Sequence, residues 1–286
     1  MSTPQPPLQT LALIFAVQLA ALLLAAALLH LIPRLGPPGP ALAARRLRAP
    51  GLALVITGVA ALPLIVCPIV AANLIDTPLA WLAGLGVGVA AQVLTVMLWT
   101  VAHELAHPAA RKGPRIVHQL NRTVGRWRNH TAVWITALAV PLFFVVRVVE
   151  YVVYPPLTWL IRLPKYNSGD WVNVSRQKFE GLVGHDLIWC LYCDWMTGVW
   201  SLGSEMLRNV ESFWCPIRFR HDKKCANCAV DFPDVNAGWA PAEGTMQDVV
   251  DTLAGKYPGP NNDNQWFNHP ARLTHNGKPI DADPTP

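Results

Sequence analysis

Charged residues are scarce in this sequence. Asp, Glu, Lys and Arg make up 14% of its 286 residues, whereas about 25% is usual for a soluble protein. Hydrophobic residues account for 52%. This deficit of charge excludes an ordinary soluble domain and predicts that much of the chain lies in a membrane.

Several motifs that would define other functions are also missing. There is no glycine-rich nucleotide loop, no nucleophile elbow and no run of charges typical of an ion filter. The net charge of +5 comes without a recognition motif, so no nucleic-acid partner is expected. The first nine residues contain no Lys or Arg, and no clear cleavage site follows. We therefore expect a retained membrane span and not a secretory signal.

Three apolar runs dominate the first part of the chain. They cover residues 8–32, 51–75 and 78–101, and none contains a charged residue. Each is long enough to cross about 30 Å of hydrocarbon. Because a backbone in lipid must satisfy its own hydrogen bonds, all three are expected to be helices.

A fourth apolar stretch, residues 131–161, is less uniform. It contains Arg147 and Glu150, which on a helix share a face and can pair. Pro155 and Pro156 follow and are expected to kink or break the helix. The stretch is either a kinked span with an interfacial helix or a re-entrant hairpin. The fold class is therefore mainly α: a polytopic membrane protein with three to four hydrophobic helices and a small Cys-rich metal-binding domain.

Basic residues orient the spans. They are concentrated in the first and third loops, and the second loop has none. They are Arg34, Arg45, Arg46 and Arg48 in the first loop, and Arg111, Lys112, Arg115, Arg122, Arg126 and Arg128 after the third run. Because basic loops stay in the cytoplasm, we expect an integral protein of the bacterial inner membrane whose N-terminus lies outside.

The composition changes near residue 163, which divides the chain into three parts. Residues 1–162 are the expected transmembrane domain, residues 163–233 a Cys/Trp-rich domain, and residues 234–286 a polar, partly disordered tail. Apolar residues recur every three or four positions in 197–214 and predict an amphipathic helix. A short helix that begins at Thr245 is expected in the tail.

The third apolar run ends in the sequence VAHELAH, an H-E-x-x-H motif. His103 and His107 are four apart, so on a helix both imidazoles can bind one Zn²⁺. Glu104 lies beside the first ligand and can take a proton from a metal-bound water. The pattern predicts a zinc site with Glu104 as the catalytic base.

The segment VAHELAHPAARKG resembles the motif of the site-2 protease family of intramembrane metalloproteases. The resemblance covers about fifteen residues and implies that His103 and His107 are ligands and Glu104 is the base. It also implies a third ligand, an Asp from a later Pro-containing segment. The nearest counterpart is Asp170 in LPKYNSGDW, which lacks the Asp-Gly pair of that family.

Pro108 is evidence against this zinc site, because it directly follows His107. Its ring clashes with the carbonyl of Glu104, and it pushes His107 out of helical geometry. Two other roles therefore stay open for the motif: metal or haem ligation without catalysis, and a structural role at a helix end.

Five of the six cysteines lie in the second half of the chain and predict a metal site. They are Cys190 and Cys193 in WCLYC, Cys215 in FWCPI, and Cys225 and Cys228 in KKCANC. Two C-x-x-C pairs supply four thiolates, which suits zinc. An iron–sulfur cluster and a dithiol redox pair are the alternatives. Cys67 lies in the second apolar run and is expected to fill apolar space.

Two kinds of function follow from these patterns. The specific hypothesis is a membrane-embedded zinc hydrolase, possessing the H-E-x-x-H site. The alternative is a non-enzymatic scaffold or assembly factor with a structural zinc domain, or a membrane redox protein with haem or iron–sulfur. The expected partners are membrane lipid and a membrane protein or membrane-associated protein.

Overall fold

The computed structural model describes residues 7–220, 238–256, 274–275 and 278–279. By its internal contacts the chain divides into two compact units. Unit 1 comprises Met1–Phe143 and Ser168–Gly198, and unit 2 comprises Phe144–Asn167 and Val199–Pro286. The described residues are mainly helical, which confirms the mainly α part of the predicted class, whereas a Cys-rich metal-binding domain is not shown among them.

The helices follow the apolar runs. In chain order they are α1 (Pro7–Leu31), η1 (Ile32–Arg34), α2 (Gly39–Arg45), α3 (Gly51–Ile56), η2 (Thr57–Ala61), α4 (Leu62–Leu74), α5 (Ala80–Ala106), α6 (Pro108–Lys112), α7 (Ile116–Val124), α8 (Arg126–Thr136), η3 (Ala137–Ala139), α9 (Val140–Val148), η4 (Val149–Val153), α10 (Tyr154–Leu160), α11 (Ser168–Trp171), η5 (Arg176–Lys178), α12 (Gly184–Trp214) and α15 (Met246–Lys256). Two short antiparallel strands, β1 (Thr274–His275) and β2 (Lys278–Pro279), pair near the end.

Four helical runs are long and apolar enough to cross a membrane. They span Pro7–Arg34, Gly51–Leu74, Ala80–Ala106 and Arg126–Leu160. The protein is therefore an integral membrane protein, as its composition predicted.

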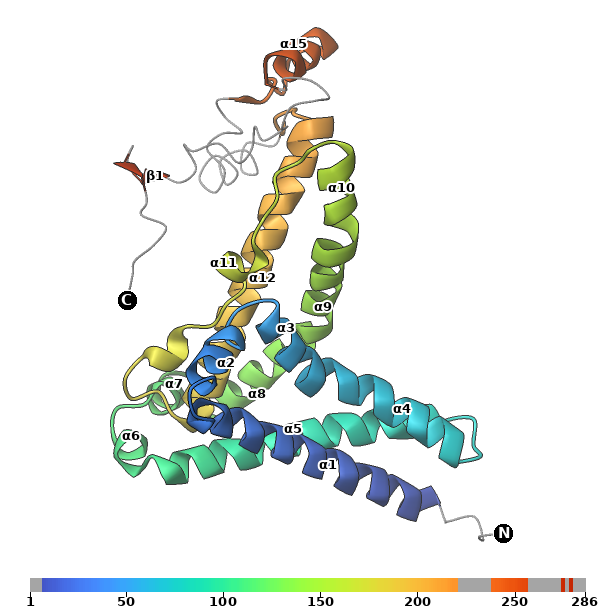
Figure 1. Ribbon diagram of the computed structural model, residues 1–286, viewed down its shortest axis with the longest axis vertical. Helices are drawn as coiled ribbons and strands as arrows, with labels where there is room; N and C mark the ends of the chain where they lie inside the picture. Colours follow the sequence, from blue (N-terminus) through green and yellow to red (C-terminus); the bar gives the residue numbers. More distant parts are fainter. Residues whose placement is uncertain (1–6, 221–237, 257–273, 276–277, 280–286) are drawn as a thin grey trace. The chain divides into compact units, whose positions relative to one another are not determined.

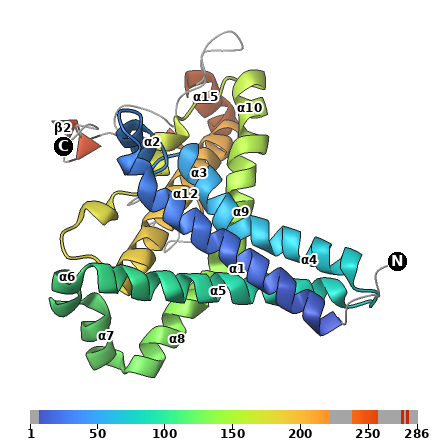
Figure 2. The same ribbon diagram turned by 60° about the horizontal axis from the view of Figure 1, so that its bottom comes forward.

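The first three spans, α1, α4 and α5, lie side by side in unit 1 (Figures 1 and 2). Small residues bring α4 and α5 together: a Cβ at Gly88 would lie 2.9 Å from the carbonyl oxygen of Pro63. Cys67 is only 1% exposed and belongs to the core between these helices. Its predicted role as a small apolar filler is confirmed.

The fourth run is a continuous helical stretch of 35 residues, Arg126–Leu160, which includes the 3-10 turn η3 and the π-helical turn η4. Pro155 lies in the first turn of α10, directly after the π-helical turn η4. A π-helical turn shifts the carbonyls that a proline ring would otherwise meet, so the helix continues past it. This continuity favours the kinked span over the hairpin.

Unit 2 contains a buried polar pair. Arg147 and Glu150 are 5% and 4% exposed and form the predicted ion pair within one helix. Gly203 of α12 lies close to this helix, because a Cβ there would be 3.0 Å from Val146 and 3.7 Å from an oxygen of Glu150. The helix expected at 197–214 is confirmed and begins earlier, at Gly184.

The short helix predicted in the tail is also present. It is α15, which begins at Met246. The backbone N–H of Thr245 donates to the carboxylate of Asp248 at 2.6 Å, and the hydroxyl of Thr245 donates to the same oxygen at 2.8 Å. These bonds form the cap that the spacing of the two residues predicted.

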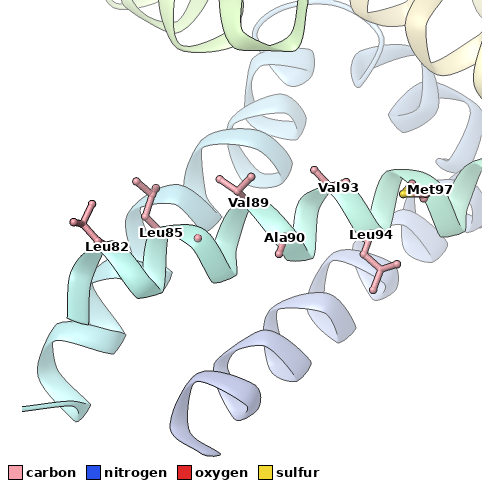
Figure 3. Close-up of a pocket in the computed structure, with 8 residues that line it drawn as sticks. Leu82, Leu85, Val89, Ala90, Val93, Leu94 and Met97 are labelled. Carbon is pink, nitrogen blue, oxygen red and sulfur yellow. The ribbon is translucent and has the colours of Figure 1, made fainter. Parts of the chain in front are cut away.

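Apolar surface covers the outer side of α5. Figure 3 shows a shallow hollow whose lining residues all come from this one helix, among them Leu82, Val89 and Met97. The lining carries no polar side chain that could bind or transform a substrate. We therefore assign this surface to contact with lipid.

Candidate functional site at the end of α5

Helix α5 ends where the proline predicted. Its last helical residue is Ala106, and His107 has left helical geometry with φ −125° and ψ 64°. Pro108 then begins the short helix α6. The sequence HELAH is thus divided, with His103 and Glu104 in the last turn of α5 and His107 just outside it.

The two imidazoles remain close but have different hydrogen-bonding roles. Their ring centroids are 4.3 Å apart and the rings are stacked. Nδ1 of His103 accepts the backbone N–H of Gly184 at 3.2 Å, whereas Nδ1 of His107 lies 2.9 Å from the carbonyl oxygen of His103 and donates to it. Neutral His103 therefore carries its proton on Nε2, and neutral His107 carries its proton on Nδ1.

This difference matters for metal binding. A zinc-binding histidine ligates through one nitrogen and usually donates a hydrogen bond from the other. His107 has that arrangement, with Nε2 available. His103 has the opposite one, because its Nδ1 is already an acceptor and its Nε2 holds the proton. In this structure His103 and His107 are therefore not equivalent as metal ligands.

Glu104 is bound by a cation. Its Oε1 accepts a hydrogen bond from Nη2 of Arg115 at 2.9 Å and another from the backbone N–H of His185 at 3.3 Å. A general base needs a carboxylate oxygen directed at a water. In Glu104 an oxygen instead connects α5 to two segments that are distant in the sequence.

Arg115 and Asp186 complete a buried cluster. Arg115 Nε donates to Asp186 Oδ2 at 2.6 Å, and Arg115 Nη2 donates to the carbonyl of Val183 at 3.2 Å. Asp186 also accepts the backbone N–H groups of Ile116 at 3.2 Å and Val117 at 3.0 Å, at the start of α7. We call Glu104, Arg115 and Asp186 the clasp, because together they join α5, α7 and α12.

The clasp residues keep their charges. Burial alone would raise the pKa of Asp186, but the nearby His185 imidazole, 3.7 Å away, and the hydrogen bond from Arg115 outweigh it and hold that pKa below its ordinary value. Burial alone would lower the pKa of Arg115, but its two carboxylate partners raise it further above its ordinary value. The Arg115 side chain is only 2% exposed, so solvent screens these charges weakly.

A glycine makes the clasp possible. Gly184 has φ +51°, and a Cβ at this position would collide with the side chain of Glu104. Only glycine adopts this backbone conformation without strain and leaves that space open. The start of α12 is therefore shaped to receive Glu104.

Asp170, the predicted third ligand, lies in α11 and pairs with Arg48 at 3.6 Å. Both side chains are more than half exposed. Within the described ranges, no three His, Cys, Asp or Glu side chains are grouped as metal ligands. The structure thus does not bring Asp170 together with His103 and His107.

The predicted cysteine ligands are only partly described. Cys190 and Cys193 lie three apart in α12, Cys215 follows the end of that helix, and all are free thiols. Burial raises the pKa of the Cys190 thiol. Cys225 and Cys228 lie outside the described residues. Zinc, iron–sulfur and haem stay predictions.

Sequence reasoning missed the central residue of the clasp. The position of Arg115 among the basic residues of its loop indicates only the orientation of the spans, and Asp186 carries no pattern that singles it out. No spacing connects positions that are 71 residues apart. The segment VGHDL offered one indication, a glycine before an acidic helix start.

No protein-family model, curated protein or solved structure matches this chain. The fold and the site therefore define its class directly: an integral membrane protein with a buried ionic clasp at the end of its third span.

Proposed function

We propose that this protein is a non-enzymatic membrane scaffold or assembly factor of the bacterial inner membrane. The observation that carries the proposal is the binding of Glu104 by Arg115 and by the N–H of His185. These contacts give the HELAH segment a structural role, which is to hold the start of α12 against α5. The expected partners are lipid and a second membrane protein or membrane-associated protein.

Helix α12, which the clasp holds against α5, carries two cysteines, Cys190 and Cys193. In the proposal, Cys190 and Cys193 supply two thiolates to a structural zinc, and Cys225 and Cys228 supply the other two. Cys215 is not among these ligands, because α12 separates it from Cys193 by 22 residues, or about 33 Å of helix. The described pair is suitable, because residues three apart on a helix share a face. Bound zinc would deprotonate these thiols and tie α12 to the chain that follows it.

The raised pKa of Cys190 disfavours a dithiol redox pair. A redox-active thiol needs a lowered pKa, so that it is a thiolate at neutral pH. A thiol with a raised pKa is inert until a metal displaces its proton.

Metal content of the purified full-length protein tests this function. We expect one zinc per chain in the wild type and in His103→Ala, and loss of zinc in Cys193→Ser. His118→Ala, which changes an exposed histidine in α7, is the matched control for His103→Ala. An optical spectrum without haem or iron–sulfur bands is expected.

Other results would contradict the proposal. Loss of zinc in His103→Ala, with retention in His118→Ala, would restore the hydrolase. Haem or iron–sulfur bands in the wild type would favour the redox protein. A wild-type protein that binds no metal under reducing conditions would contradict the proposal of a structural zinc.

A further inference from the structure

Helix α7 carries an apolar stripe on its exposed surface. Ile116, Leu120 and Val124 are spaced four residues apart, so they lie along one face of the helix. Their exposed fractions are 49%, 42% and 46%. Polar side chains, among them Gln119 and Arg122, occupy the opposite face and are also exposed. A helix divided in this way is amphipathic, with an apolar face that the described part of the chain leaves open.

Contacts near both ends of α7 fix which of its faces is exposed (Figure 2). At the start, the N–H groups of Ile116 and Val117 donate to the carboxylate of Asp186 at 3.2 Å and 3.0 Å, and the Val117 side chain is buried. Toward the end, Nδ2 of Asn129 in α8 donates to Oδ1 of Asn121 at 2.9 Å. Because α7 cannot roll about its axis without breaking these bonds, the clasp keeps the stripe exposed.

The chain around the stripe is basic and lacks acidic side chains. No Asp or Glu occurs between Glu104 and Glu150. The exposed basic residues of α6, α7 and α8 are Arg111, Lys112, Arg122, Arg126 and Arg128. Within the part of the chain that the structure describes, none of them forms an ion pair. An exposed apolar stripe accompanied by such cations complements anionic headgroups that lie over acyl chains.

We propose that α7 lies in the plane of the membrane surface and binds anionic phospholipid. Ile116, Leu120 and Val124 enter the boundary of the acyl chains, and the basic residues contact the headgroups. Connectivity favours lipid over a protein partner, because residues 107–125 join two membrane spans. Trp127, at the start of α8, is 80% exposed, and tryptophan is enriched at the membrane–water interface.

Amide hydrogen exchange of the full-length protein in nanodiscs tests this role. The exchange of residues 116–124 is compared in phosphatidylcholine alone and with increasing fractions of phosphatidylglycerol. We expect phosphatidylglycerol to slow this exchange in the wild type. Arg126→Gln should reduce the slowing about fivefold, which is the contribution of one arginine near an anionic leaflet. Arg45→Gln removes an exposed arginine of α2 and, as the matched control, should leave the slowing unchanged.

A second pair of variants tests the apolar stripe. Leu120→Ser removes its central side chain and should abolish most of the response of residues 116–124 to phosphatidylglycerol. Gln119→Ser introduces the same residue one position earlier, on the polar face of α7. Leucine and glutamine have similar helix propensities, so the two variants lose a similar amount of intrinsic helicity. Gln119→Ser should keep the response of the wild type.

Four outcomes would overturn the proposal. Exchange of residues 116–124 that is equally fast in every lipid mixture would leave the stripe to a protein partner. Slowing that appears only in discs with two copies of the chain would identify a second copy as the occupant. An equal loss of slowing in Arg45→Gln and Arg126→Gln would indicate diffuse attraction to a charged surface. Equal responses in Leu120→Ser and Gln119→Ser would show that the stripe does not enter the membrane.

Discussion

Glu104, which is partly buried, and Glu150, which is buried, illustrate two ways in which a membrane protein tolerates a charge. Glu104, in unit 1, is bound by an arginine 11 residues away and by a backbone N–H 81 residues away. Glu150, in unit 2, pairs with Arg147, three residues earlier on the same helix. The first carboxylate connects distant segments, whereas the second is neutralised within its own helix.

The difference shows which charges hold the fold together. The Arg147–Glu150 pair needs only helical periodicity, so it forms wherever that helix forms. The clasp needs α5, α7 and α12 to meet, so its free energy contributes to tertiary structure. Breaking the clasp should therefore destabilise the protein much more than breaking an exposed pair.

The largest effect is expected from Arg115→Ala. This change leaves Asp186 buried without its cation and Glu104 without its main donor. The free energy of unfolding should fall by about 3–5 kcal/mol, as measured by SDS titration in mixed micelles. Arg122→Ala, an exposed position in α7, should change it by less than about 0.5 kcal/mol. Similar values for the two variants would contradict the clasp.

Gly184→Ala should cost about 3 kcal/mol, because it adds backbone strain and displaces Glu104 from the clasp. Gly181→Ala measures the cost of backbone strain without any displacement of Glu104. Gly181 also has a left-handed φ of +83°, but a Cβ there meets nothing within 4 Å, so strain alone should cost about 1 kcal/mol. Equal costs in the same titration would show that Glu104 does not fill the space at Gly184.

Asp186→Asn should cost about 2 kcal/mol at neutral pH, less than Arg115→Ala, since the amide oxygen can still accept one hydrogen bond. The pKa of Asp186 is lower folded than unfolded, so the unfolded chain binds more protons in acid. Its contribution is complete above its ordinary pKa of 3.8 and is lost as the pH falls through the folded value. Wild type and Asp186→Asn should therefore converge in stability on acidification, and parallel pH profiles would contradict this.

The smallest effect is expected from Asp170→Asn. The pair with Arg48 is exposed and 3.6 Å long, so its loss should change stability by less than about 0.5 kcal/mol. Zinc content should not change either. A drop of one zinc per chain would place Asp170 among the ligands, contrary to its position beside Arg48.

Local features of this fold could be predicted from the sequence, and distant contacts could not. Apolar length predicted the spans, Pro108 predicted the end of α5, and the three-residue spacing predicted the Arg147–Glu150 pair. Each follows from the geometry of one helix. The clasp depends on which segments meet after the chain has crossed the membrane repeatedly. A periodic pattern within one helix does not predict which distant segments meet.

The candidate site shows the same limit. The H-E-x-x-H spacing correctly placed the two imidazoles near each other, because four residues make about one helical turn. It could not show that Arg115 would bind the intervening glutamate. A motif predicts which side chains share a face, whereas the partners on the facing element decide what those side chains do.

The central claim is that Glu104 acts through Arg115. A double-mutant cycle measures this directly, from the free energies of unfolding of wild type, Glu104→Ala, Arg115→Ala and the double variant. The clasp predicts a coupling free energy of about 1.5–3 kcal/mol between the two side chains. A coupling below about 0.5 kcal/mol would show that Glu104 is energetically independent of Arg115 and would contradict a structural role for the motif.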